Sequence, residues 1–221
     1  MSKRDHQKDE PGSDDEGEER WARRWPWLLP LAAGIFLGAA ILEMQPEALE
    51  LAGQQAWLWV AVGLVIFIGV RNGLDAIGQH GLAWVATLGL WLHSFLEGAV
   101  TGLSFQASVL TGLLVTGGLI LHLIPELGAS LALMTSAGLS ERQGVVRTLI
   151  TWVILVVGFV ALVFFLPDLS QAVLGAALAA GTGGFLYLAY LSWQERRWEV
   201  GPSVAAAAAG VLAMAAIRLL A

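Results

Sequence analysis

The strongest constraint on this chain is the near-absence of charge after its first 25 residues. Residues 1–25 hold eight of the eighteen acidic residues and six of the twelve basic ones. Charged residues make up only 14% of the chain and hydrophobic residues 57%, whereas a soluble domain usually carries about 25% charged residues. A chain with this distribution of charge is predicted to lie in a lipid bilayer.

Apolar stretches between charged or turn-forming breaks predict how the chain crosses the bilayer, because a crossing helix needs roughly 20 apolar residues. We expect an all-α, polytopic helix bundle with about seven transmembrane helices. The predicted spans are 27–44, 54–71, 82–106, 111–134, 145–166, 170–193 and 201–220. Residues 1–24 mix both charge signs and are expected to form a disordered cytoplasmic tail, so that residues 25–221 form the membrane domain.

The basic residues predict the orientation, because Lys and Arg accumulate on the cytoplasmic side. With seven spans and the N-terminus inside, eleven of the twelve basic residues fall at or next to cytoplasmic segments. Only Arg218, near the C-terminus, falls outside. The sequence therefore predicts an N-terminus inside, a C-terminus outside and a multi-pass protein of the cell membrane.

Four ionisable residues lie deep within the predicted spans: His93, Glu97, His122 and Glu126. Such residues are costly in a membrane and mark functional sites. The third and fourth spans form a predicted antiparallel hairpin, and an apex near residue 109 or 110 would set His93 opposite Glu126 and Glu97 opposite His122. The chain has no cysteine, so these nitrogen and oxygen donors are the candidate ligands of a divalent metal.

Other features have both a functional and a structural interpretation. Pro125 removes a helix hydrogen bond beside the predicted ligands, which suits either a cavity-lining helix or a bent packing helix. The glycine pairs Gly34/Gly38, Gly69/Gly73 and Gly98/Gly102 are expected to permit close helix packing.

Two further groups of polar residues flank the predicted spans. A candidate entrance comprises Glu43, Glu47 and Glu50, which would concentrate cations or form an ordinary solvated loop. A candidate exit comprises Asn72, Asp75 and His80, for which solvation of a helix end is the alternative.

Two motifs resemble those of the Zrt/Irt-like (ZIP) metal transporters. His93-Ser94-Phe95-Leu96-Glu97-Gly98 resembles the HSxxEG motif of that family, and His122-Leu123-Ile124-Pro125-Glu126 resembles its HxxPE motif. The stretch from Gly34 to Ala48 is similar to the family's GVFLxxxxxHxxPEA helix, with Glu43 in place of the histidine. The similarity covers roughly residues 31–220.

This resemblance implies that His93, Glu97, His122 and Glu126 bind the transported metal, that metal moves toward the cytoplasm and that the protein is a homodimer. Family members usually have eight helices, so the family's first helix is expected to be missing. The span 145–166 has no acidic residue, which predicts a single metal position.

The leading hypothesis is therefore a transporter, not an enzyme, for a divalent transition metal: zinc first, with iron, manganese or cadmium as alternatives. The metal is the substrate, and no cofactor is expected. The expected partners are metal ions, the lipid bilayer and a second copy of the chain, with no nucleic acid. The alternative hypothesis is a membrane-embedded metal-dependent hydrolase with the same ligands, which would need a further general base.

Overall fold

The computed structural model describes residues 26–78, 81–165, 171–196 and 199–220. Within these residues every regular element is a helix, which confirms the predicted all-α fold. The tail predicted for residues 1–24 lies outside the described residues.

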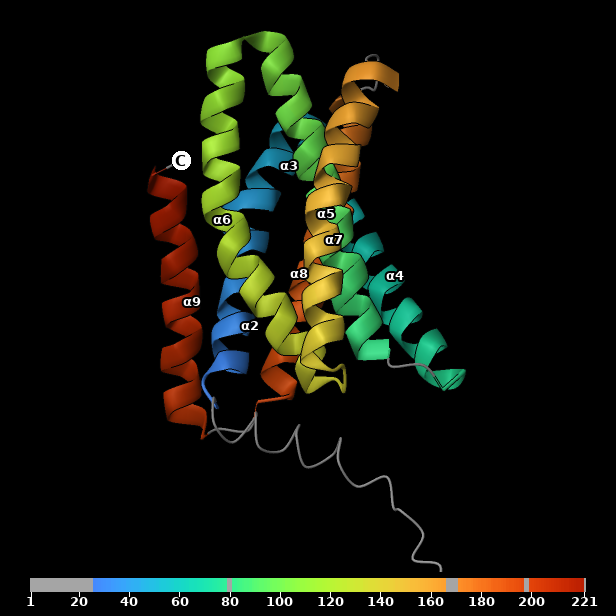
Figure 1. The fold of residues 1–221 in the computed structure, drawn as a ribbon, viewed down its shortest axis with the longest axis vertical. Coiled ribbons are helices and arrows are strands. Elements are labelled where there is room, and N and C mark those ends of the chain that lie inside the picture. The colour runs from blue at the N-terminus through green and yellow to red at the C-terminus, as the bar shows by residue number, and fades with distance from the viewer. Residues whose placement is uncertain (1–25, 79–80, 166–170, 197–198, 221) are drawn as a thin grey trace, which may run out of the picture.

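The described helices follow one another with short connections (Figure 1). The first continuous stretch comprises α2 (Leu28–Gly38), the π-helical segment η1 (Ala39–Met44), α3 (Gln45–Ala52), the 3-10 turn η2 (Gly53–Gln55) and α4 (Ala56–Ala76). It is followed by α5 (Gly81–Ala107), α6 (Val109–Ser136), α7 (Glu141–Val160) with η3 (Ala161–Phe165), α8 (Gln171–Gln194) and α9 (Val200–Leu220).

Five helical stretches of the described chain are long and apolar enough to cross a membrane. The first of them, Leu28–Ala76, has 49 residues, which as one straight helix would be about 74 Å long. That length is more than twice the roughly 30 Å of a bilayer's hydrocarbon core. Gly53 interrupts it with φ of 60° and ψ of −152°, a conformation that favours glycine. The stretch therefore holds two helices joined at a turn.

Helices α5 and α6 form the predicted hairpin, whose apex stands at one end of the molecule (Figure 1). Ser108 separates them with an extended backbone, and its hydroxyl accepts a hydrogen bond of 3.0 Å from the backbone N–H of Thr111. This N-cap satisfies one of the free N–H groups at the start of α6. The chain thus reverses direction within one or two residues of the predicted apex.

Helix α7 lies directly against the back of the hairpin because two glycines allow backbone to approach backbone. A Cβ atom on Gly98 would lie 2.0 Å from the carbonyl oxygen of Leu155, and one on Gly158 would lie 2.0 Å from that of Phe95. No side chain can occupy such a space. The glycine that ends the HSxxEG motif is therefore required for packing.

Reciprocal glycine contacts of the same kind join two further helix pairs, α2 with α9 and α4 with α8. The glycines concerned are Gly34 and Gly210 in the first pair and Gly63 and Gly183 in the second. The packing role predicted for Gly34/Gly38 and Gly98/Gly102 is confirmed. For Gly69 and Gly73 the prediction is wrong, since no atom of the described residues lies within 4 Å of a Cβ placed on either. The end of α4 that carries them diverges from the bundle (Figure 1).

The contact between α5 and α7 yields a test of stability. Gly98→Ala forces the two backbones apart and should lower the free energy of unfolding by at least about 1–3 kcal/mol, the usual cost of overpacking a core. The measurement is thermal denaturation of the purified protein in detergent. Gly117→Ala on α6 is the matched control, because a Cβ there meets nothing within 4 Å. Equal melting temperatures for the two variants would contradict the role given to Gly98.

Candidate metal site

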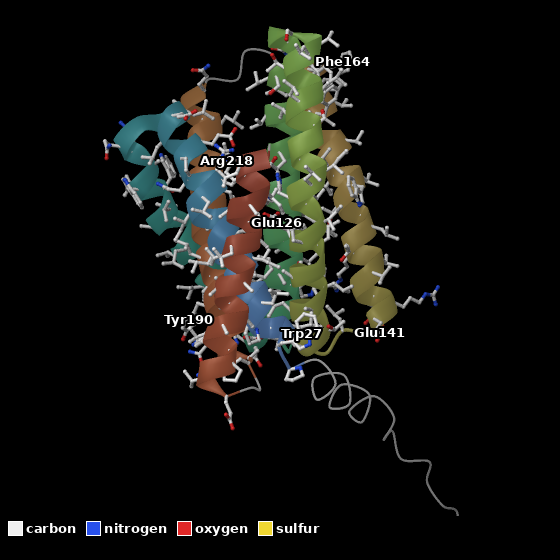
Figure 2. All side chains as sticks on the ribbon, turned by 90° about the vertical axis from the view of Figure 1, so that its left-hand side faces the viewer. Trp27, Glu126, Glu141, Phe164, Tyr190 and Arg218 are labelled. Atoms are coloured by element: carbon white, nitrogen blue, oxygen red, sulfur yellow. The ribbon has the colours of Figure 1, made fainter. Side chains whose placement is uncertain are left out.

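Three helical segments bring five ionisable side chains together inside the bundle. Helix α5 contributes His93 and Glu97, α6 contributes His122 and Glu126, and η1 contributes Glu43. Both histidines lie near the middle of their helices, which are 27 and 28 residues long. The cluster therefore lies far from either end of the hairpin. Figure 2 shows Glu126 within the bundle, behind α9.

The hairpin sets each histidine opposite a glutamate. His93 Nε2 lies 3.0 Å from Glu126 Oε2, and His122 Nε2 lies 3.7 Å from Glu97 Oε2. Glu97 also approaches the histidine of its own helix, with Oε1 at 3.8 Å from His93 Nε2. The two ring centroids are 6.1 Å apart. The structure therefore brings together the four side chains that the mirrored spacing pairs across the hairpin.

Glu43 is the site residue that the spacing did not reveal. The sequence placed it at a candidate entrance, but its Oε1 lies 2.8 Å from His122 Nδ1 and its side chain is only 14% exposed. Glu43 belongs to η1, the wide helical turn that precedes Pro46. Proline has no N–H and its ring clashes with the carbonyl four residues earlier, here that of Leu42, so the helix widens at this point. A signal did exist, because Glu43 stands where the family's motif has a histidine.

Burial of these ionisable side chains costs free energy. His93 and Glu126 are fully buried, and His122 and Glu97 are nearly so. Both ring nitrogens of His93 and both carboxylate oxygens of Glu126 lack a hydrogen-bond partner among the described residues, although the two side chains approach closely. A buried polar group without a partner costs about 1–3 kcal/mol. The carboxylate oxygens of Glu126, and the one ring nitrogen of neutral His93 that carries no proton, have lone pairs available to a cation.

The ligand atoms form two overlapping groups that suit a divalent metal. His93, His122 and Glu126 make one group, and Glu43, Glu97 and His122 make the other, with the ligand atoms of each within 4.8 Å of one another. Ligands of a tetrahedral zinc ion lie about 3.4 Å apart, given metal–ligand bonds of about 2.1 Å. The observed separations bracket this value. Because both groups contain His122, they adjoin each other.

Packing behind the site fixes the orientation of His93. Its ring lies 4.8 Å, centroid to centroid, from the ring of Phe185 on α8, which in turn packs edge-on against Phe36 of α2. Both phenylalanines are fully buried. With Gly98 against α7 on another side of α5, the ligand-bearing segment of that helix is held between α7 and α8.

The remaining residues of the candidate entrance continue from Glu43 along the same segment. Glu47 lies one helical turn farther on in α3, half-buried and within electrostatic range of Glu43 and Glu97. Glu50 is exposed. The three carboxylates therefore run from the surface of the bundle to the buried cluster.

Two of the candidate exit residues, Asn72 and Asp75, lie away from the cluster. Asn72 is exposed on the diverging end of α4. Asp75 has a local structural role, since its Oδ1 accepts a hydrogen bond of 2.9 Å from the backbone N–H of Gly81 at the start of α5. It also lies 3.6 Å from the guanidinium of Arg71. His80 lies outside the described residues.

Comparison with known proteins gives several relatives that are all named as zinc transporters. Zinc transporter ZIP13 of Pongo abelii is 26% identical over 218 residues, which cover 87% of this chain and 66% of the relative. Zinc transporter ZIP4 of Homo sapiens is 34% identical over 109 residues, 49% of this chain and 16% of the relative. Zinc transporter foi of Drosophila melanogaster is 28% identical over 108 residues, 49% of this chain and 15% of the relative. No family model matches the chain.

The chain thus spans 66% of the length of the first of these relatives and much less of the other two. The long apolar helices and these membrane-protein relatives agree on a multi-pass membrane protein. Together with the HSxxEG and HxxPE motifs on α5 and α6, these matches support the resemblance of the chain to the Zrt/Irt-like (ZIP) transporters.

Proposed function

We propose that this protein carries divalent transition-metal ions across a membrane, with zinc as the first candidate. One observation carries the proposal: two histidines and three glutamates from three helical segments converge in the middle of an apolar helix bundle. Intramembrane ionisable groups of this kind mark ion pathways. The relatives are themselves named zinc transporters, which favours transport over the hydrolase alternative.

The donor set agrees with a transition metal but does not select one. Imidazole nitrogen suits zinc and iron, and carboxylate oxygen also suits manganese. Zinc is proposed first because of the relatives' names; iron, manganese and cadmium are the alternatives. The metal is substrate here, so we propose dehydration at the cluster, capture and onward release without covalent chemistry.

The proposed route begins at the carboxylates of η1 and α3. Glu50, Glu47 and Glu43 lead from the exposed end of α3 to His122. Glu43 is carried by a segment packed on α8 and α9, while the other four side chains belong to the hairpin backed by α7. A shift between these two parts would change the number of ligands around the ion, which is our proposed basis for its release. The direction proposed is toward the cytoplasm, as the family resemblance implies.

We further propose seven crossings with the N-terminus inside and the C-terminus outside. Two crossings come from the stretch that turns at Gly53, and each of the helices α5 to α9 supplies one. Among the described residues, Arg71, Arg142, Arg147 and Arg196 then lie toward one end of the bundle and Arg218 toward the other, in agreement with the positive-inside rule. The homodimer and the exit through Asn72, Asp75 and His80 stay predictions.

Removing the buried carboxylates tests the transport site. Glu97→Gln and Glu126→Gln keep the shape of the side chain but lose its charge, and each should reduce zinc uptake into proteoliposomes by at least about tenfold. Glu141→Gln, at an exposed position in the first turn of α7 and outside the proposed route, is the control and should retain uptake within about twofold. Undiminished uptake by both buried variants would disprove the assignment.

Glu43 gives a separate test of the fifth ligand. Glu43→Ala should reduce uptake about tenfold because His122 loses its partner and the ion loses a donor. Glu43→His replaces the donor by a nitrogen and should recover at least part of the uptake. If Glu43→Ala and Glu43→His take up zinc at the same rate, Glu43 contributes only packing or charge and is not a ligand.

The topology is testable because the chain has no cysteine. Gln54→Cys lies at the turn between α3 and α4, and Arg142→Cys lies in the first turn of α7; both positions are exposed. A membrane-impermeant maleimide should label Gln54→Cys in intact cells but label Arg142→Cys only after permeabilisation. The reverse pattern would invert the proposed orientation, and labelling of both positions in intact cells would contradict the crossing count.

A further inference from the structure

Helix α9 runs parallel to α2, and glycine contacts fix their relative register. A Cβ on Gly34 would meet the backbone of Ala207, and a Cβ on Gly38 would meet the side chain of Met214 at 2.7 Å. The partner positions advance along α9 as the chain advances along α2. One turn beyond Met214 on the same face of α9 is Arg218, and about one turn beyond Gly38 along the first helix is Glu43.

Arg218 is therefore level with the acidic segment that leads to the cluster. Its positive charge lies within electrostatic range of both Glu43 and Glu47. Figure 2 shows Arg218 on α9, farther along the bundle toward the hairpin apex than Glu126. Arg218 is exposed and forms no salt bridge with any other described residue. Its charge acts on the approach to the site without being tied to one carboxylate.

The other described arginines cannot share this role. Arg71, Arg142 and Arg147 lie on helix segments at the opposite end of the bundle, and Arg196 lies just after α8 at that same end. Meanwhile Glu43, Glu47 and Glu97 are carboxylates within electrostatic range of one another. Arg218 is thus the one fixed positive charge, within the described residues, on the side from which these carboxylates are approached.

We infer that Arg218 is a tethered counter-cation: it offsets the carboxylates of Glu43 and Glu47 when no metal is bound and opposes the incoming metal electrostatically. This inference rests on the proposed function. Pathways that conduct ions must bind them firmly enough to capture them and weakly enough to let them leave. A fixed positive charge beside the approach lowers the affinity of the carboxylates for a cation. The repulsive energy is twice as large for a divalent ion as for a monovalent ion.

The direction of the effect follows from the sign of the charge. Removing the charge of Arg218 makes the potential at Glu43 and Glu47 more negative, so a divalent cation should bind more tightly. The change should shrink as ionic strength rises, because an exposed charge is screened within about 10 Å at 0.1 M salt. If Arg218 only stabilised the C-terminal turn of α9, its loss would lower stability without a salt-dependent change in metal affinity.

The experiment measures equilibrium zinc binding to the purified full-length protein in detergent, at low and high salt. Arg218→Gln should lower the Kd for zinc by about threefold at low salt, with the difference largely lost at high salt. Arg218→Lys keeps the charge and should match the wild type. Arg196→Gln, at the opposite end of the bundle, is the control for loss of an arginine and should also match it.

A double-mutant cycle with Glu47→Gln tests whether Arg218 affects zinc binding through the carboxylate of Glu47. If Arg218 acts through Glu47, the effect of Arg218→Gln should be smaller in the Glu47→Gln background. A wild-type protein that binds no zinc would overturn the proposed function. A wild type that binds zinc, with a Kd unchanged or raised in Arg218→Gln at low salt, would overturn the inference alone.

Discussion

Ionisable side chains in the middle of a membrane bundle are stable only where other polar groups or an ion share their site, and the arrangement of this protein follows from that constraint. The α5–α6 hairpin meets it by facing histidine to glutamate across the helix interface, as in the 3.0 Å approach of His93 to Glu126. Glu43 adds a third carboxylate beside His122. In the proposed function, the same lone pairs that require partners would bind the divalent cation.

The rest of the bundle holds this cluster in place. Three helix pairs are joined by reciprocal glycine contacts: α5 with α7, α4 with α8, and α2 with α9. Along the chain, each pair takes one helix from before α6 and one from after it. Such contacts depend on backbone shape and work in lipid, where apolar surfaces gain little by meeting each other. The ligands of α5 thus lie on a helix packed closely against α7, and those of α6 lie on the other arm of the hairpin, while Glu43 reaches them from the α2–α9 pair.

Much of this could be predicted from the sequence, for identifiable reasons. The lack of charge after residue 25 implied membrane helices, and the i, i+4 spacing of His93 with Glu97 and of His122 with Glu126 implied one hairpin face each. The place of Glu43 could not be predicted from spacing, because helical periodicity assumes a regular helix and η1 widens before Pro46; only its position in the family's motif pointed to the cluster. Gly69 and Gly73 show the converse error: their spacing suits helix packing, but no described helix lies within 4 Å of a Cβ placed on either. Sequence spacing shows which residues share a face, not what that face meets.

The most direct test of the central claim is anomalous diffraction at the zinc absorption edge from crystals of the protein soaked in zinc. The account predicts the strongest anomalous peak inside the bundle, at about 2.0–2.2 Å from donor atoms of His122 and of at least two among His93, Glu126, Glu43 and Glu97. Zinc peaks found only at exposed carboxylates such as Glu50, with none between α5 and α6, would contradict it.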